Sequence, residues 1–134
     1  MLRNDVLAWI EYAKNDMEVA VHEMEYLRNP RLRPYEIILH HCHQCAEKML
    51  KAYILNSGGT IAPIHVLNTL LRTCSRHDKS FSGKRIIDHC VYLDTFWNIK
   101  YPDFTVSVDA SHATRGINSA KRIYDFVSKK LSLG

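Results

Sequence analysis

The densest cluster of residues able to do chemistry is the run His-His-Cys-His-Gln-Cys, which ends at Cys45. Cys42 and Cys45 have the spacing of a thiolate pair in a zinc site. In a helix, however, both thiols fall on the apolar arc, where cysteine behaves as a small hydrophobic residue. A structural zinc site needs four converging ligands, and Cys74 and Cys90 do not form a second CxxC. We therefore expect core cysteines, no metal site and no cofactor, with a two-ligand site of His41 and Cys45 as the alternative.

The opposite arc of the same helix is polar. Projected at about 100° per residue, it carries His43, Gln44, Glu47, Lys48 and Lys51. One interpretation is an ordinary hydrated face, in which i, i+4 pairs each contribute only ~0.2–0.5 kcal/mol. The other is a surface that holds a phosphate, a base or a partner, because it combines cationic donors with titratable imidazoles. It is not a phosphate-binding loop, since the chain contains neither GxGxxG nor GxxxxGK followed by Ser or Thr.

Helices must position these residues, because apolar side chains recur at gaps of three and four along nearly the whole chain. The expected helices span roughly 4–28, 34–56, 65–76, 82–100 and 109–131. Pro34 suits a first helical turn, Gly58 and Gly59 suit a helix end, and Asp109 or Ser111 suits the cap of the last helix. The sequence therefore predicts an all-α fold, an antiparallel up-and-down four-helix bundle plus one short extra helix.

Length and composition indicate the class of protein. The chain has the size of a single domain, residues 1–134, and its 46% hydrophobic and 24% charged residues exclude a disordered or fibrous chain. Its net charge of +4 permits contact with phosphates without requiring it. The longest stretch without Asp, Glu, Lys or Arg, residues 52–71, includes two glycines and a proline and so cannot span a bilayer as a helix. The first apolar run is interrupted by Glu11 and Lys14, unlike a signal peptide. We therefore expect a cytoplasmic protein with reduced cysteines and no membrane contact.

The second helix resembles the signature of the HEPN family (higher eukaryote and prokaryote nucleotide-binding domain), approximately Gln-Ala-Ala-Glu-Lys-x-Leu-Lys-Ala. Here it falls on Gln44–Ala52, with Cys45 in place of an alanine. Other stretches match the family in the same order, so that the resemblance covers nearly the whole chain. The matching residues are Trp9, Ala13, Asp16, Met17 and Ala20 in the first helix, then Gly58 or Gly59, His65, Leu67, Leu70 and Leu71, and finally Tyr101, Pro102 and Asp103. The chain departs from the pattern at Ile64, where the family often has Thr, and at Lys100, where it usually has Arg.

The resemblance implies a helical bundle that is usually a homodimer. Family members are often encoded beside small nucleotidyltransferases, in two-component systems that include toxin–antitoxin pairs. Some branches are metal-independent endoribonucleases with an Arg, four to six residues and a His near the start of the last long helix. In those branches the His acts as general acid or base and the Arg holds the scissile phosphate.

The endoribonuclease pattern fits this chain poorly. Arg72 and His77 have four residues between them but lie at the end of the short third helix, and Arg85 and His89 have only three. His112 lies near the expected place without an Arg upstream within reach. Arg72, His77 and His112 therefore remain weak catalytic candidates, and the resemblance favours a branch without ribonuclease activity.

The sequence thus favours a binding module over an enzyme. Its ligand would be a nucleotide or RNA, and its partners a second copy and a small nucleotidyltransferase, with a metal-independent endoribonuclease as the alternative function. A third, weaker hypothesis is a metal or redox sensor that uses the thiols. The candidate ligand-binding residues are His43, Gln44, Glu47, Lys48, Lys51, His65, Lys100, Tyr101 and Asp103. A patch of Tyr92, Phe96 and Trp97 at the end of the fourth helix is the expected dimer interface.

Overall fold

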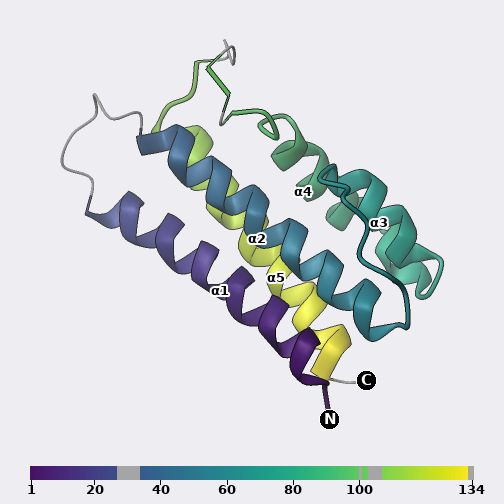
Figure 1. Cartoon of the computed structure of the whole chain (residues 1–134). Coiled ribbons are helices and arrows are strands. Elements are labelled where there is room, and N and C mark those ends of the chain that lie inside the picture. Colours follow the sequence, from purple (N-terminus) through teal and green to yellow (C-terminus); the bar gives the residue numbers. More distant parts are fainter. Residues whose placement is uncertain (27–33, 100, 103–106, 133–134) are drawn as a thin grey trace.

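The computed structural model describes residues 1–26, 34–99, 101–102 and 107–132, and within them it contains helices and no strand. In chain order the elements are α1 (Asn4–Glu25), α2 (Pro34–Asn56), α3 (Leu67–Ser75), the 3₁₀ helix η2 (Lys79–Ser82), α4 (Lys84–Asp94) and α5 (Ala110–Ser132). Figure 1 shows α1, α2, α4 and α5 running in alternating directions, with α3 beside α4. The predicted all-α architecture, a four-helix bundle with an extra short helix, is confirmed.

The second helix has the predicted bounds, Pro34–Asn56. Proline has no N–H to leave unsatisfied in a first helical turn, and Gly58 follows the last turn with a φ of 88°. The last helix is also capped as expected. The Asp109 carboxylate accepts hydrogen bonds from the backbone N–H groups of Ser111 (3.0 Å) and His112 (3.2 Å).

The fourth helix is shorter than predicted, because α4 ends at Asp94 and η2 forms a separate turn before it. The turns after Asp94 direct Phe96 and Ile99 inward, where both are buried against Leu39 of α2. The expected aromatic patch is therefore wrong in part. Phe96 is buried, and Tyr92 is partly buried and donates its hydroxyl to the backbone oxygen of His112 (3.0 Å), so of the three only Trp97 is exposed.

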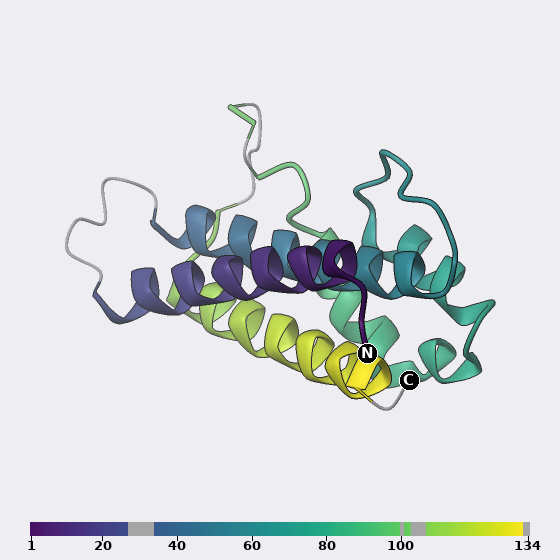
Figure 2. The same cartoon turned by 60° about the horizontal axis from the view of Figure 1, so that its bottom comes forward.

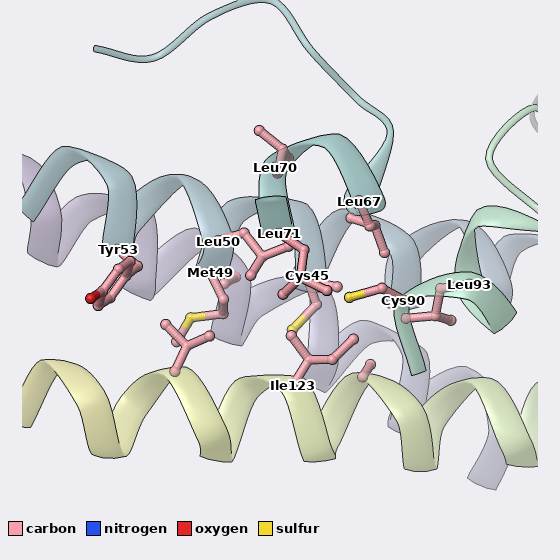
Figure 3. Packing of buried hydrophobic residues seen from close by; sticks show 14 of the residues in the cluster. Cys45, Met49, Leu50, Tyr53, Leu67, Leu70, Leu71, Cys90, Leu93 and Ile123 are labelled. Atoms are coloured by element: carbon pink, nitrogen blue, oxygen red, sulfur yellow. The ribbon is translucent and has the colours of Figure 1, made fainter. Parts of the chain in front are cut away.

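The core lies between α2 and its neighbours. Cys45, Met49 and Leu50 of α2 pack among apolar side chains of α3, α4 and α5, including Ile123 (Figure 3). The predicted inward orientation of the thiols is confirmed, since Cys42 and Cys45 are both fully buried. Gly116 lets α5 approach α2 closely, because a Cβ there would lie 2.5 Å from Leu39 Cδ2. None of the described helices combines the length and the hydropathy that crossing a bilayer requires.

Candidate functional site

The polar residues of α2 are drawn into the molecule. His43, Glu47 and Lys51 are only 3%, 5% and 5% exposed, because α3 and the end of α4 lie over this side of the helix. The expectation that these three side chains face water is therefore wrong. Gln44 and Lys48 are half-buried.

Glu47 is the centre of this buried cluster. Its Oε2 accepts a hydrogen bond from Lys51 Nζ at 3.0 Å and lies 3.2 Å from Nδ1 of His65. Its Oε1 has no hydrogen-bond partner among the described residues, and His43 Nδ1 lies 3.9 Å from it. The Trp9 ring of α1 closes the cluster, with Lys51 Nζ 5.9 Å from its centroid. The structure thus brings His65 beside Glu47 as expected, but as part of a cluster of polar side chains inside the protein.

Asp94, the last residue of α4, connects the Glu47 cluster to α3. Its Oδ1 accepts a hydrogen bond from the backbone N–H of Leu67 (2.9 Å) and lies 3.1 Å from His43 Nε2. Its Oδ2 accepts from both the backbone and the side-chain nitrogen of Asn68 (3.0 and 2.9 Å). Burial alone would raise the pKa of Asp94, but the hydrogen bonds from His43, Leu67 and Asn68 hold that pKa below its ordinary value.

Sequence reasoning did not identify Asp94, yet a local signal exists. The residue before α3 is Val66, whose side chain cannot accept hydrogen bonds from the first amides of the helix. A helix with such an N-cap needs an acceptor from elsewhere in the fold, and the carboxylate of Asp94 supplies it.

A second buried carboxylate, Asp16 of α1, binds two more polar residues of α2. His41 Nδ1 lies 2.8 Å from its Oδ1, and Lys48 Nζ donates a short hydrogen bond to its Oδ2. Burial acts to raise the pKa of Asp16, but these two partners hold that pKa below its ordinary value. Both lysines of the predicted ligand face are therefore already paired with carboxylates inside the molecule.

The four thiols are not placed for chemistry. Burial raises the pKa of Cys42 and of Cys74 to about 12, and burial likewise raises the pKa of Cys45 and of Cys90. A thiol that stays protonated at neutral pH is a poor metal ligand and a poor nucleophile. Among the described residues, no three or more His, Cys, Asp or Glu side chains come together in a way that could hold a metal ion.

Accessible cationic side chains come together in a groove formed by α4 and α5. The groove has a volume of about 730 Å³ and is lined by residues of η2, α4 and α5. Its lining residues are Ser80, Gly83, Lys84, Arg85, Ile86, His89, Asn118, Arg122 and Phe126. Arg85 and His89 are four residues apart on α4, and Asn118 and Arg122 are four residues apart on α5. Because residues four apart share one face of a helix, each pair faces the groove together. The groove thus presents three permanently charged cations and an imidazole, and one of the cations, Lys84, lies 3.7 Å from the exposed carboxylate of Asp88.

His89 is the titratable group of this groove. Its Nδ1 lies 2.9 Å from the hydroxyl of Ser119, whose side chain is buried. Burial, followed by the charges of Arg122 and Arg115, lowers the pKa of His89 below its ordinary value, against the opposing charge of Asp88. A pKa below the ordinary value of 6.5 favours the neutral imidazole at physiological pH.

The charge of the helices is distributed unevenly across the bundle. α5 contains five Lys or Arg residues and one Asp, whereas α1 contains six Asp or Glu residues and one Lys. The excess positive charge of the described helices thus lies on the side of the groove, where it attracts anions.

The other predicted site residues do not converge. Arg72 lies exposed on α3 with its Nε 3.5 Å from the backbone oxygen of Asn68, and His77 is exposed just after that helix. His112 lies in the first turn of α5, where its ring is 6.0 Å from that of Phe96. Arg85 and His89 did not fit the endoribonuclease spacing, because only three residues lie between them. The structure nevertheless places both side chains in one groove.

The elbow after α4 is described in part. Tyr101 is exposed, and its ring lies 6.5 Å from that of Trp97 in an edge-on arrangement. Lys100 and Asp103 lie outside the described residues.

Comparisons with known proteins agree with this fold. The family model described as "HEPN domain" matches residues 6–131. The crystal structure of TT1696 from Thermus thermophilus superposes with a TM-score of 0.78 at 22% identity, covering 96% of this chain and 99% of that one. The structure of ST0689, an archaeal HEPN homologue, superposes with a TM-score of 0.72 at 25% identity, covering 97% of this chain and 98% of that one. No functionally curated protein matches the chain.

Proposed function

The chain belongs to the HEPN domain family, and from this premise we propose that it is a binding module whose ligand, a nucleotide or an RNA segment, places its phosphates in the groove between α4 and α5. The observation that carries the proposal is the convergence of Lys84, Arg85 and Arg122 with His89 on one groove. Guanidinium groups bind phosphates through paired hydrogen bonds, and a groove with low-dielectric walls strengthens that attraction.

The chemistry of the remaining lining residues supports a nucleotide over a bare phosphate. Asn118 offers both an amide donor and an amide acceptor to a base or a ribose. Phe126 adds an aromatic ring to the lining, and this ring packs against Phe81 at an interplanar angle of 81°. The predicted α2 surface is the weaker site, since Lys48 and Lys51 are bound to Asp16 and Glu47.

Arg122→Ala tests the groove, with Lys121→Ala as a matched control on the same helix. Lys121 is exposed and does not line the groove, so both variants remove one cation from α5. Isothermal titration with AMP, ATP and a short oligoadenylate is expected to show binding by the wild type. Arg122→Ala should weaken that binding about ten- to a hundredfold, because a charge-assisted hydrogen bond is lost, and Lys121→Ala should change it little. Equal binding by the two variants, or no binding by the wild type, contradicts the proposal.

A second candidate function, metal-independent RNA cleavage, is favoured by one observation: Arg85, Arg122 and a neutral His89 line the same groove. A neutral imidazole can take the proton of a ribose 2′-hydroxyl as that oxygen attacks the adjacent phosphorus. The 5′ oxygen then leaves with a proton from solvent, and a 2′,3′-cyclic phosphate remains. The guanidinium groups would stabilise the charge that builds on the phosphoryl oxygens.

Incubation of RNA with the purified protein in EDTA tests this second candidate. Cleavage should disappear in His89→Ala and persist in His77→Ala, since His77 is exposed outside the groove. General acid–base catalysis typically contributes 10²–10⁴-fold in rate, so the loss would be readily measured on a gel. If the RNA stays intact at high protein concentration, the ribonuclease function is contradicted and the binding function is not affected.

The family resemblance also supports three proposals about partners. The protein forms a homodimer, it associates with a small nucleotidyltransferase, and the two proteins act as a toxin–antitoxin-like pair in the cytoplasm. Light scattering decides the first, and co-purification with the product of a neighbouring gene decides the second.

A further inference from the structure

The outer side of α1 carries a regular stripe that no other described helix covers. Its residues recur at gaps of four and three, the spacing of the contact positions in a coiled coil. They are Ala8, Tyr12, Asn15, Val19 and His22, and all five are exposed. Tyr12 is 61% exposed and Val19 40%, although both are large apolar side chains. Figure 1 and Figure 2 show α1 at the edge of the bundle, next to α2 and α5.

The α1 helix packs through its other side. Val6, Ala13 and Ala20 are fully buried against the rest of the bundle, and they recur at intervals of seven. A helix that only covers a core needs one apolar face. The second stripe on α1 therefore has no role in packing its own bundle.

Acidic side chains border the stripe. Glu11, Glu18 and Glu25 recur every seven residues along one edge, and Glu23 lies on the other edge. A shallow surface pocket of about 350 Å³ lies around Val19, and Glu18 and Glu23 are among its lining residues. In a coiled coil these flanking positions face the flanking residues of the partner helix and select its charge.

We propose that this stripe is a docking surface for an amphipathic helix of another protein, one whose apolar seam is flanked by Lys and Arg. Tyr12 and Val19 supply the apolar contacts, and Asn15 between them favours a partner with a polar residue at the matching position, which fixes the register. The glutamates provide the charge complementarity. At about 1.5 Å per residue and about 3.6 residues per turn, the 15 residues from Ala8 to His22 span about four turns and about 22 Å, which matches about two heptads of a partner helix.

The flanking charges disfavour a second copy of this chain as the occupant. Two α1 helices docked on each other would place glutamate rows at the same interface, and like charges at such positions are destabilising. The exposed side of α5 carries Arg115, Arg122 and Lys129 every seven residues but has no apolar seam between them. The geometry therefore points to a basic helix from a different chain.

Two synthetic three-heptad peptides test the proposal. Both carry an Ile and Leu seam with one central Asn, and they differ only in having Lys or Glu at every flanking position. Each peptide repels itself and so enters the titration unpaired. In fluorescence anisotropy the Lys peptide is expected to bind the wild-type protein at least about tenfold more tightly than the Glu peptide, with the difference shrinking as salt is added.

Exchange of the charges on the protein makes the test specific. In the double variant Glu11→Lys, Glu18→Lys the preference should reverse in favour of the Glu peptide. Tyr12→Ser, Val19→Ser should abolish binding of both peptides, and the matched change Val91→Ser on exposed α4 should have no effect. Circular dichroism melting confirms that each variant is folded.

Three results would overturn the proposal. They are equal binding of the two peptides, binding of neither, and a wild-type dimer that dissociates in the Tyr12→Ser, Val19→Ser variant, which would identify the occupant as a second copy. The groove between α4 and α5 serves as an independent control, because the α1 variants should retain the wild-type response to AMP. Failure of the docking surface therefore leaves the proposed function untouched.

Discussion

Lys51→Ala is expected to lower the free energy of unfolding by about 3–5 kcal/mol, although lysine is usually a surface residue. The substitution removes the hydrogen-bonding cation from a carboxylate that stays buried and whose Oε1 already has no hydrogen-bond partner among the described residues. Restoring hydration to Glu47 would require water to enter beside Trp9 and His43. Urea unfolding followed by circular dichroism measures the change.

A variant without either charge distinguishes two quantities: the free energy lost when Glu47 is buried without a partner, and the net contribution of the Glu47–Lys51 ion pair to stability. The double variant Glu47→Leu, Lys51→Met removes both partners and should recover most of the lost stability, because buried ion pairs are often replaceable by apolar side chains. Lys121→Ala, at an exposed position, should stay within about 0.5 kcal/mol of the wild type. If Lys51→Ala unfolds at the wild-type urea concentration, water reaches Glu47 and the ion pair does not stabilise the fold.

Asp94→Ala is expected to cost about 2–4 kcal/mol and to loosen α3 before the rest of the bundle. The backbone amides of Leu67 and Asn68 lose their acceptor, and His43 loses a carboxylate partner. Hydrogen exchange should therefore accelerate first in α3. Asp88→Ala is the matched control, since Asp88 lies on the same helix with a side chain that is 63% exposed.

The contribution of Asp94 should also depend on pH in one direction. Its pKa in the folded protein lies below the ordinary value of 3.8, so the unfolded chain binds the proton more readily. The stabilisation is complete above pH 3.8 and is lost as the pH falls through the pKa of the folded state. The stability difference between the wild type and Asp94→Ala should therefore narrow in acid. A constant difference, or unchanged exchange in α3, shows that another group caps the helix.

Local chemistry made part of the fold predictable. The bounds of α2 are marked by Pro34 and Gly58, which act on the backbone within one turn. The end of α4 is not marked in this way. Phe96 and Ile99 continue an apolar spacing compatible with a helix, but they are buried against Leu39 after the helix has ended. Apolar spacing alone does not distinguish a continuing helix from successive turns over the same core.

The site was harder to predict than the fold for a related reason. The residue types on each arc of α2 were evident, but the burial of His43 and Glu47 depends on Asp94 and His65, which follow much later in the chain. The basic groove likewise joins α4 to Arg122 of α5. No local pattern encodes such pairings, since they exist only once the helices have packed.

The four sealed sulfurs have a practical consequence. All four are buried, and the solvent side of the described bundle offers no thiolate to an alkylating reagent. Iodoacetamide can label these positions only when the interior opens to water, and the reaction is irreversible. The rate at which iodoacetamide labels the native protein therefore measures how often the core opens to water, without a dye or an engineered tag.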